Sequence, residues 1–155
     1  MNYKIQHGAE VSVITLEGDI NEEIRESLDE IEKELKSKQV VFDCEGVRKI
    51  NSIGVRDWML SLGRLANRCA VSFVNCPEVF VDMAVMVPTF TRGRPIRSFY
   101  ATYVCEDCAV ERTLLVEIKA GQAVLPGDCV CAKCGGKLMP DEELESDIRF
   151  VITSA

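Results

Sequence analysis

The sequence has no apolar run long enough to cross a membrane, and its first residues lack the apolar core of a secretory signal. It has one histidine, His7, and no glycine-rich loop of the kind that holds phosphates. His7 stands in an expected hairpin turn, where a solvated role is the simplest interpretation. Because no set of nucleophile, base and acid can be assembled, we expect a cytoplasmic protein that is not an enzyme and has no membrane contact.

An excess of positive charge is also missing. The chain has 18 Lys and Arg against 25 Asp and Glu, a formal net charge of −7. The deficit is shared, with −4 over residues 1–92 and −3 over residues 93–155. Nucleic-acid-binding domains carry a basic patch or stripe. We therefore expect no nucleic-acid partner for either part.

The 155 residues, 47% of them hydrophobic, suffice for one ordinary domain or two small ones. The segment Pro88–Pro95 is rich in residues that break regular structure and predicts a boundary. We divide the chain into residues 1–92 and 93–155. A strand is expected over Ile96–Val104, directly after the boundary, so the two parts should pack together.

The stretch Val40–Leu65 organises the first part. Its apolar start, Val40–Phe42, predicts a buried strand, and Gly46 marks a loop after it. Asn51 and Ser52 then stand where a helix should begin, because either side chain can cap the first free backbone amides. Five apolar residues recur at helical spacing after them, namely Val55, Trp58, Met59, Leu62 and Leu65. The stretch predicts a strand–loop–helix unit, with a candidate site where the helix begins.

The remaining periodicity predicts the order β-β-α-β-α-β-α over the first part. Asp19 and Glu22 have the spacing of a capping box for a helix that carries an apolar stripe from Ile20 to Leu35. Right-handed crossovers would place the helices against a mixed sheet. The expected elements are strands over Tyr3–Gln6, Val11–Leu16 and Ala70–Val74, and a further helix over Pro77–Met86.

This order and the turn at residues 51–54 resemble the STAS family, which includes anti-sigma-factor antagonists and the cytoplasmic tails of sulfate transporters. The family usually writes the turn Asp-Ser-Ser-Gly and is phosphorylated on the serine beside the glycine. Here the turn is Asn51-Ser52-Ile53-Gly54, so the usual phosphoacceptor is Ile53. The resemblance covers roughly residues 3–90. It implies a protein partner, an anti-sigma factor or related kinase, that docks on Asn51 to Trp58, although a tryptophan at this position is more often a core residue than a partner anchor.

Eight cysteines are many for an intracellular chain of this size, and five of them lie between residues 105 and 134. Cys105 with Cys108, and Cys131 with Cys134, form two C-x2-C pairs separated by 22 residues. Four thiolates at this spacing are typical of a tetrahedral zinc site. Gly135 and Gly136 would supply the tight turn after the second pair. The remaining cysteines, Cys44, Cys69 and Cys76, are interpreted as small apolar residues.

The spacing predicts one structural Zn²⁺ per chain. Expected strands over 113–118, 137–139 and 148–152, with a loop over 121–127, resemble a zinc ribbon. Cys129 could compete with Cys131 as a ligand, but a C-x-C pair suits the site less well. Free thiols, a disulfide pair and iron are the alternatives. Four protein thiolates leave no open position for water, which argues against a catalytic metal.

Together the two parts predict an α/β protein with a STAS-like mixed sheet and a small β-rich zinc ribbon. The function that we expect is a non-enzymatic protein-interaction module in bacterial signalling, such as an anti-sigma-factor antagonist or partner-switching regulator. The alternatives are a nucleic-acid-binding ribbon, a zinc-thiolate redox sensor and a nucleotide-binding STAS-like domain. Ser52 remains the local residue that could carry a phosphate.

Overall fold

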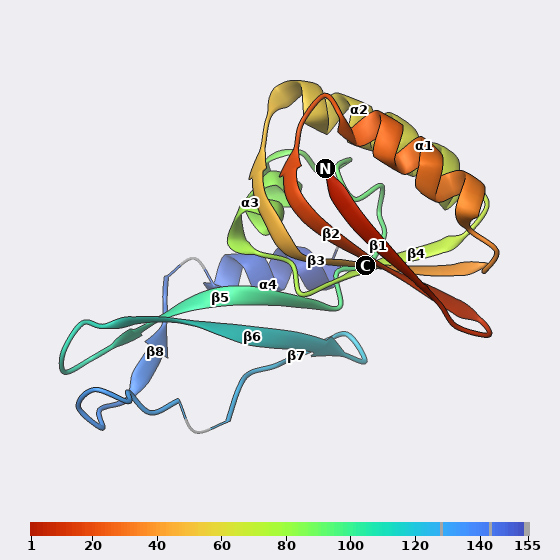
Figure 1. Ribbon diagram of the computed structural model, residues 1–155. Coiled ribbons are helices and arrows are strands. Elements are labelled where there is room, and N and C mark those ends of the chain that lie inside the picture. The colour runs from red at the N-terminus through yellow and green to blue at the C-terminus, as the bar shows by residue number, and fades with distance from the viewer. Residues whose placement is uncertain (128, 143, 154–155) are drawn as a thin grey trace.

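The computed structural model describes residues 1–127, 129–142 and 144–153. It contains two four-stranded sheets that lie one below the other, with helices packed against each (Figure 1). The mixed α/β class expected from the sequence is confirmed. Among the described residues, no helix is both long and apolar enough to cross a bilayer.

The first sheet has the strand order β1-β2-β3-β4. β1 and β2 pair antiparallel, whereas the pairs β2–β3 and β3–β4 are parallel. Helices α1 and α2 lie side by side over one face of this sheet (Figure 1). The elements are β1 (Asn2–His7), β2 (Val11–Ile20), α1 (Ile24–Glu34), β3 (Gln39–Ile50), α2 (Ser52–Ala66), β4 (Ala70–Val74) and α3 (Glu78–Met86). This is the predicted order of elements.

An aromatic cluster centred on Trp58 forms the core of the first part. The Trp58 side chain is completely buried and its Nε1 donates a hydrogen bond to the Phe90 carbonyl at 3.0 Å. Its ring stacks on Phe90 and meets Phe80 edge-on, at centroid distances of 5.7 and 6.0 Å. Phe42 and Phe73 complete the cluster from β3 and β4. The cluster therefore joins α2, α3 and the sheet, and the core interpretation of Trp58 is correct.

The second sheet is entirely antiparallel, with the order β7-β6-β5-β8. Its strands are β5 (Ser98–Cys105), β6 (Glu111–Lys119), β7 (Gln122–Val124) and β8 (Leu138–Pro140), and α4 (Leu144–Thr153) follows. Figure 1 places α4 beside β5, below α3.

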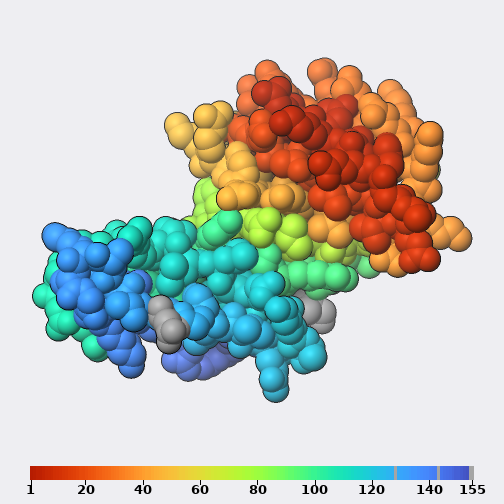
Figure 2. All heavy atoms as spheres, turned by 60° about the horizontal axis from the view of Figure 1, so that its bottom comes forward, coloured from red at the N-terminus to blue at the C-terminus, as the bar shows by residue number. Residues whose placement is uncertain are grey.

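Parts of the predicted boundary segment, residues 88–95, are packed against the rest of the protein. Phe90 and Thr91 are buried, and Arg94 donates from Nη2 to the Ala66 carbonyl near the end of α2. Backbone bonds then join residues 95–100 to β4 and to Cys76 just after it, including Phe73 N to Pro95 O at 3.0 Å and Tyr100 N to Cys76 O at 2.8 Å. In Figure 2 the yellow-green and green residues of this region lie between the two lobes. The two parts are thus in direct contact, as expected.

Four local predictions were wrong. Asp19 lies in β2 and α1 begins at Ile24, so Asp19 and Glu22 form no capping box, and the Asn21 side chain instead accepts from Glu23 N. The loop expected at Gly46 is part of β3, where a register shift against β2 accommodates it. The loop expected over residues 121–127 contains β7. The strand expected over 148–152 is helix α4, because its β-branched residues follow an acidic helical first turn.

Candidate metal centre and partner surface

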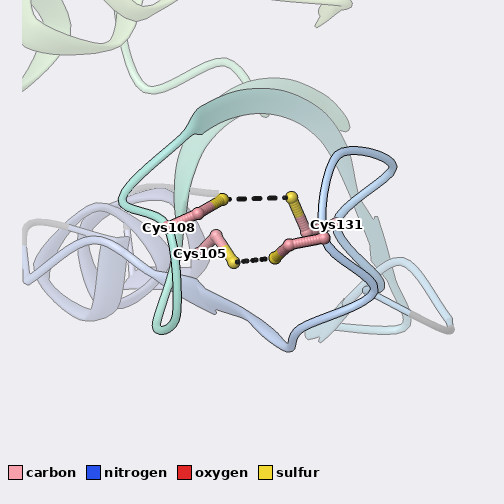
Figure 3. Close-up of side chains that lie close together, drawn as sticks. Cys105, Cys108 and Cys131 are labelled. Carbon is pink, nitrogen blue, oxygen red and sulfur yellow. Dashed lines mark hydrogen bonds between the residues drawn. The ribbon is translucent and has the colours of Figure 1, made fainter.

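The structure brings the four cysteines of the two C-x2-C pairs together. Their sulfur atoms all lie within 4.8 Å of one another. The Sγ atoms of Cys105 and Cys134 are 3.4 Å apart, and those of Cys108 and Cys131 are 3.6 Å apart. Figure 3 shows the sulfurs turned toward a common centre. The four residues are Cys105, Cys108, Cys131 and Cys134.

These distances fit a metal ion better than disulfides. Sulfurs bound at about 2.3 Å to one tetrahedral ion lie about 3.8 Å apart, whereas a disulfide bond is about 2.05 Å long. All four cysteines are free thiols in the structure. The group could therefore hold a thiophilic ion, and its four protein ligands would fill a tetrahedral shell.

Backbone turns position each pair of thiols. In the second pair Gly135 N donates to the Cys131 carbonyl at 2.8 Å, and Gly135 has φ +77°. In the first pair Ala109 N donates to the Cys105 carbonyl at 2.9 Å, and Ala109 has φ +55°. Both pairs thus use the same left-handed turn one residue after the second cysteine. The sequence pointed to the turn at Gly135 but not at Ala109, because alanine carries no turn signal.

The electrostatics of the thiols differ across the centre. Amide donors of Cys134 and Lys133 lower the pKa of Cys131 to about 6, which favours its thiolate. The Gly136 amide also lowers the pKa of Cys134, but the neighbouring Cys105 and Cys108 thiols outweigh it and raise that pKa to about 12. Cys131 is buried and Cys134 is exposed. A bound cation would favour the thiolate form of all four.

Cys129 lies outside this group among the described residues. Its Sγ points to the carbonyls of Pro126 and Gly127, at 3.3 and 3.6 Å. Cys44 and Cys76 are completely buried, and burial, followed by the neighbouring Cys44 thiol, raises the pKa of Cys76. Cys69 is partly buried. These positions agree with the apolar roles expected for Cys44, Cys69 and Cys76.

The second candidate site is the start of α2, at the carboxyl end of β3. Asn51 is the N-cap, and its Oδ1 accepts from Gly54 N at 2.7 Å. Its Nδ2 donates to Glu22 at 3.4 Å. The pKa of Glu22 is lowered by a backbone hydrogen bond first and by Asn51 second. Asn51 therefore has the capping role, and Ser52 is the first helical residue.

The residues predicted for the partner surface separate into exposed and buried ones. Asn51, Ser52 and Ile53 are exposed. Gly54 is buried, and a side chain there would meet the backbone of Ile20 and Asn21 at the end of β2. The glycine is thus required by close packing of α2 on that strand end. With Trp58 also buried, the accessible part of the turn is Asn51-Ser52-Ile53.

One exposed residue of this surface, Leu60, lies beyond the predicted residues 51–58. Leu60, seven positions after Ile53 and so on the same helix face, is 59% exposed, and Ile53 is 48% exposed. Leu60 was overlooked because Met59 and Leu62 fit the buried stripe. Its position off that stripe was the available signal.

The two sites belong to different sheets, and a side-chain contact joins those sheets. Tyr100 on β5 donates from its hydroxyl to Glu45 on β3 at 2.9 Å. Burial, followed by this hydrogen bond, raises the pKa of Tyr100. The link is long-range, so no local sequence pattern indicated it.

No protein-family model matches the sequence, and no curated protein matches it. Nine chains of solved structures match it, among them two anti-sigma factor antagonists. An anti-sigma factor antagonist from Mycobacterium paratuberculosis is 13% identical, with a TM-score of 0.49 over 61% of this chain and 83% of that one. The anti-sigma factor antagonist SpoIIAA in its unphosphorylated form is 16% identical, with a TM-score of 0.44 over 57% of this chain and 83% of that one. Both are of the kind named by the sequence resemblance, and at these values the likeness decides nothing about what the chain binds.

Proposed function

We propose that this protein is a non-enzymatic protein-interaction module of the STAS type, and that it binds a protein partner through the start of α2. The observation that carries this proposal is the pair of exposed apolar side chains, Ile53 and Leu60. They stand on a helix whose other face is packed into the aromatic core. Exposed apolar residues grouped on one element are a feature of docking surfaces.

The proposed surface, which we call the α2 ridge, consists of Asn51, Ser52, Ile53, Arg56 and Leu60, all of them exposed. By resemblance to the STAS family, the partner is an anti-sigma factor or a related kinase in bacterial signalling and transcription regulation. Ile53 cannot be phosphorylated, so the ridge stays neutral at the family's usual acceptor position. In this proposal the chain remains competent to bind.

The four-cysteine centre completes the proposal as a structural zinc site, one ion per chain, in a ribbon-like second part over residues 93–155. The ion would supply no chemistry beyond cross-linking the two cysteine pairs, because four thiolates leave no position for a substrate. Zinc suits four thiolates at tetrahedral spacing.

Insertion of a negative charge into the α2 ridge tests the partner surface. Ile53→Glu and Leu60→Glu should each weaken capture of the partner from the native cell at least tenfold, since each inserts a charge into an apolar contact. Leu125→Glu is the matched control, because Leu125 has the same 48% exposure and lies in the second part. Capture that survives both ridge substitutions, or that Leu125→Glu removes instead, would place the partner elsewhere.

Redox sensing is a second candidate, favoured by the exposure of Cys134 and the partial exposure of Cys108. Accessible thiolates are the ones that peroxides oxidise first. Peroxide at micromolar concentration should then oxidise pairs of thiolates to disulfides and release zinc, measured with a chromogenic chelator, and a dithiol reductant with added zinc should restore the site. Retention of zinc under these conditions leaves the structural role alone. Nucleic-acid binding has no such support, given the net charge of −7.

A further inference from the structure

Helix α4 is positioned by the short strand that precedes it. β8 pairs with β5 over three residues, from Cys105 opposite Leu138 to Tyr103 opposite Pro140. Asp141 N then donates to the Thr102 carbonyl at 3.1 Å, and α4 begins at Leu144. The location of α4 therefore depends on whether β8 remains attached to β5.

The attachment of β8 depends in turn on the cysteine pairs. Lys137, the residue before β8, accepts from Glu106 N at 3.1 Å, which joins the turn of one pair to that of the other. Cys131 N donates to the Gly136 carbonyl at 2.8 Å, which fixes the turn that enters β8. A pairing of three residues is marginal by itself. An ion bound to all four sulfurs would hold the two cysteine pairs together and so stabilise the pairing of β8 with β5.

Beyond β8, α4 contacts α3 and β7, and its Ile148 and Phe150 side chains are half-buried against the core. Of its ten residues only Leu144 and Val151 are buried, and an isolated helix of this length is marginal in water. It meets α3 across a groove of about 450 Å³ lined by Asp82, Val85 and Met86 of α3 and by Ser146 and Asp147 of α4. The contact is thus partial, and Met86 remains 68% exposed at its edge.

We infer that metal in the four-cysteine centre acts as a clasp that keeps α4 against α3. Loss of the ion would free β8 and α4, and uncover the surface of α3 beside the groove, while the first sheet stays folded around its own aromatic core. The metal state of the second part would then control a surface of the first. This inference rests on the proposed metal site.

Hydrogen exchange of the full chain tests the clasp. The zinc-loaded protein is compared with the protein after chelation, and zinc content is measured in both. Amides of β8, α4 and α3 should exchange at least tenfold faster after chelation, whereas β2, β3 and α1 should be unchanged. Added zinc should restore the slow exchange.

The outcomes separate this inference from the metal site itself. Zinc that leaves without any change in α3 and α4 overturns the clasp and keeps the site. Absence of zinc from the purified protein, with no zinc taken up on addition, removes both. Faster exchange throughout the chain also overturns the clasp, because it shows global rather than local release.

A substitution that displaces α4 while zinc stays bound controls for indirect effects of the chelator. Val151→Asp puts a charge where α4 is buried, and should speed exchange in α3 while zinc content is unchanged. Thr153→Asp, at an exposed position of the same helix, should leave α3 protected. Protection of α3 that Val151→Asp does not alter would show that α4 does not cover it.

Discussion

Ala109 and Gly135 occupy equivalent positions in the two cysteine pairs, yet only one is a glycine. Both have positive φ, at +55° and +77°. For a residue with a Cβ, this left-handed conformation costs roughly 1–2 kcal/mol of conformational energy, whereas glycine adopts it without that cost. The first pair therefore stores strain that the second avoids.

Substituting each residue by the other type should show this difference in backbone strain. Ala109→Gly should raise the free energy of unfolding by up to about 1 kcal/mol, since relief of strain exceeds the extra entropy of the unfolded chain. Gly135→Ala should lower it by about 1 kcal/mol, although nothing stands within 4 Å of the added Cβ. Urea titration of both variants in the zinc-loaded state measures the two changes. Equal effects of the same sign would contradict the assignment to backbone conformation.

Metal content distinguishes Cys129 from Cys131. Cys129→Ser should retain one zinc per chain, because its sulfur faces the Pro126 and Gly127 carbonyls and not the other four. Cys131→Ser should lose the ion, because it removes one of the four clustered ligands. Elemental analysis of the purified variants decides between them. Loss of zinc in the first and retention in the second would reverse the ligand assignment.

Ser52 tests whether phosphorylation acts at the turn. Asn51 makes the side-chain cap, so Ser52→Ala should change the free energy of unfolding by less than about 0.5 kcal/mol and leave partner capture intact. Protein from the native cell should carry no phosphate at Ser52, as read by intact mass and phosphopeptide analysis. Substantial phosphate there, with a Ser52→Asp variant that loses its partner, would show a switch moved by one residue from the usual position.

At the scale of elements, the two glycines of α2 differ in their surroundings, because only Gly54 packs against the end of β2. A Cβ at Gly54 would meet the backbone of Ile20 and Asn21, which cannot move without shifting the strand. At Gly63 the three atoms nearest to an added Cβ all belong to the end of the Arg92 side chain, which can rotate away. The cost of adding one methyl group should therefore differ between them.

Gly54→Ala should lower the free energy of unfolding by about 2–3 kcal/mol, as overpacking against fixed backbone does. Gly63→Ala should be neutral or stabilising by up to about 1 kcal/mol, because alanine favours the helix. Denaturant midpoints of the two variants give the comparison. A Gly54→Ala protein as stable as Gly63→Ala would mean that α2 does not pack as closely on β2 as the structure shows.

The elements that the sequence predicted well are those with strong periodicity. Ala70–Val74 was predicted as a strand with the bounds of β4, and the cap at Asn51 was one of two candidates. The extent of β3 beyond Phe42 was missed, because its pairing with β2 continues through a register shift that only the partner strand reveals. Residues 148–152 of α4 resemble a strand in the sequence, because four apolar residues and Arg149 in so short a run do not distinguish a strand from a helix. In the candidate sites, the spacing of the four cysteines was enough to predict that they lie together. The exposure of Leu60 and the strained backbone of Ala109 depend on tertiary packing and could not be predicted in this way.

At the scale of the whole molecule, backbone hydrogen bonds connect the residues on the two sides of the predicted boundary between residues 92 and 93. Phe73 N to Pro95 O, Arg97 N to Phe73 O, Cys76 N to Ser98 O and Tyr100 N to Cys76 O all cross the division, at 2.7 to 3.0 Å. Phe99, which lies in this segment, is 1% exposed. The start of β5 thus covers the outer edge of β4.

A fragment of residues 1–92 should therefore fold less stably than the same region in the full chain. Each of the four backbone bonds contributes about 1 kcal/mol, and the loss leaves the edge of β4 open to other chains. We expect a lower denaturant midpoint for the tryptophan fluorescence of Trp58, together with association that increases with concentration. A fragment of residues 1–100 restores the bonded segment without the cysteine centre, and should recover much of the midpoint. If residues 1–92 alone unfold at the midpoint of the full chain and remain monomeric, the two parts are independent domains and the backbone bonds between them contribute nothing to the stability of the first.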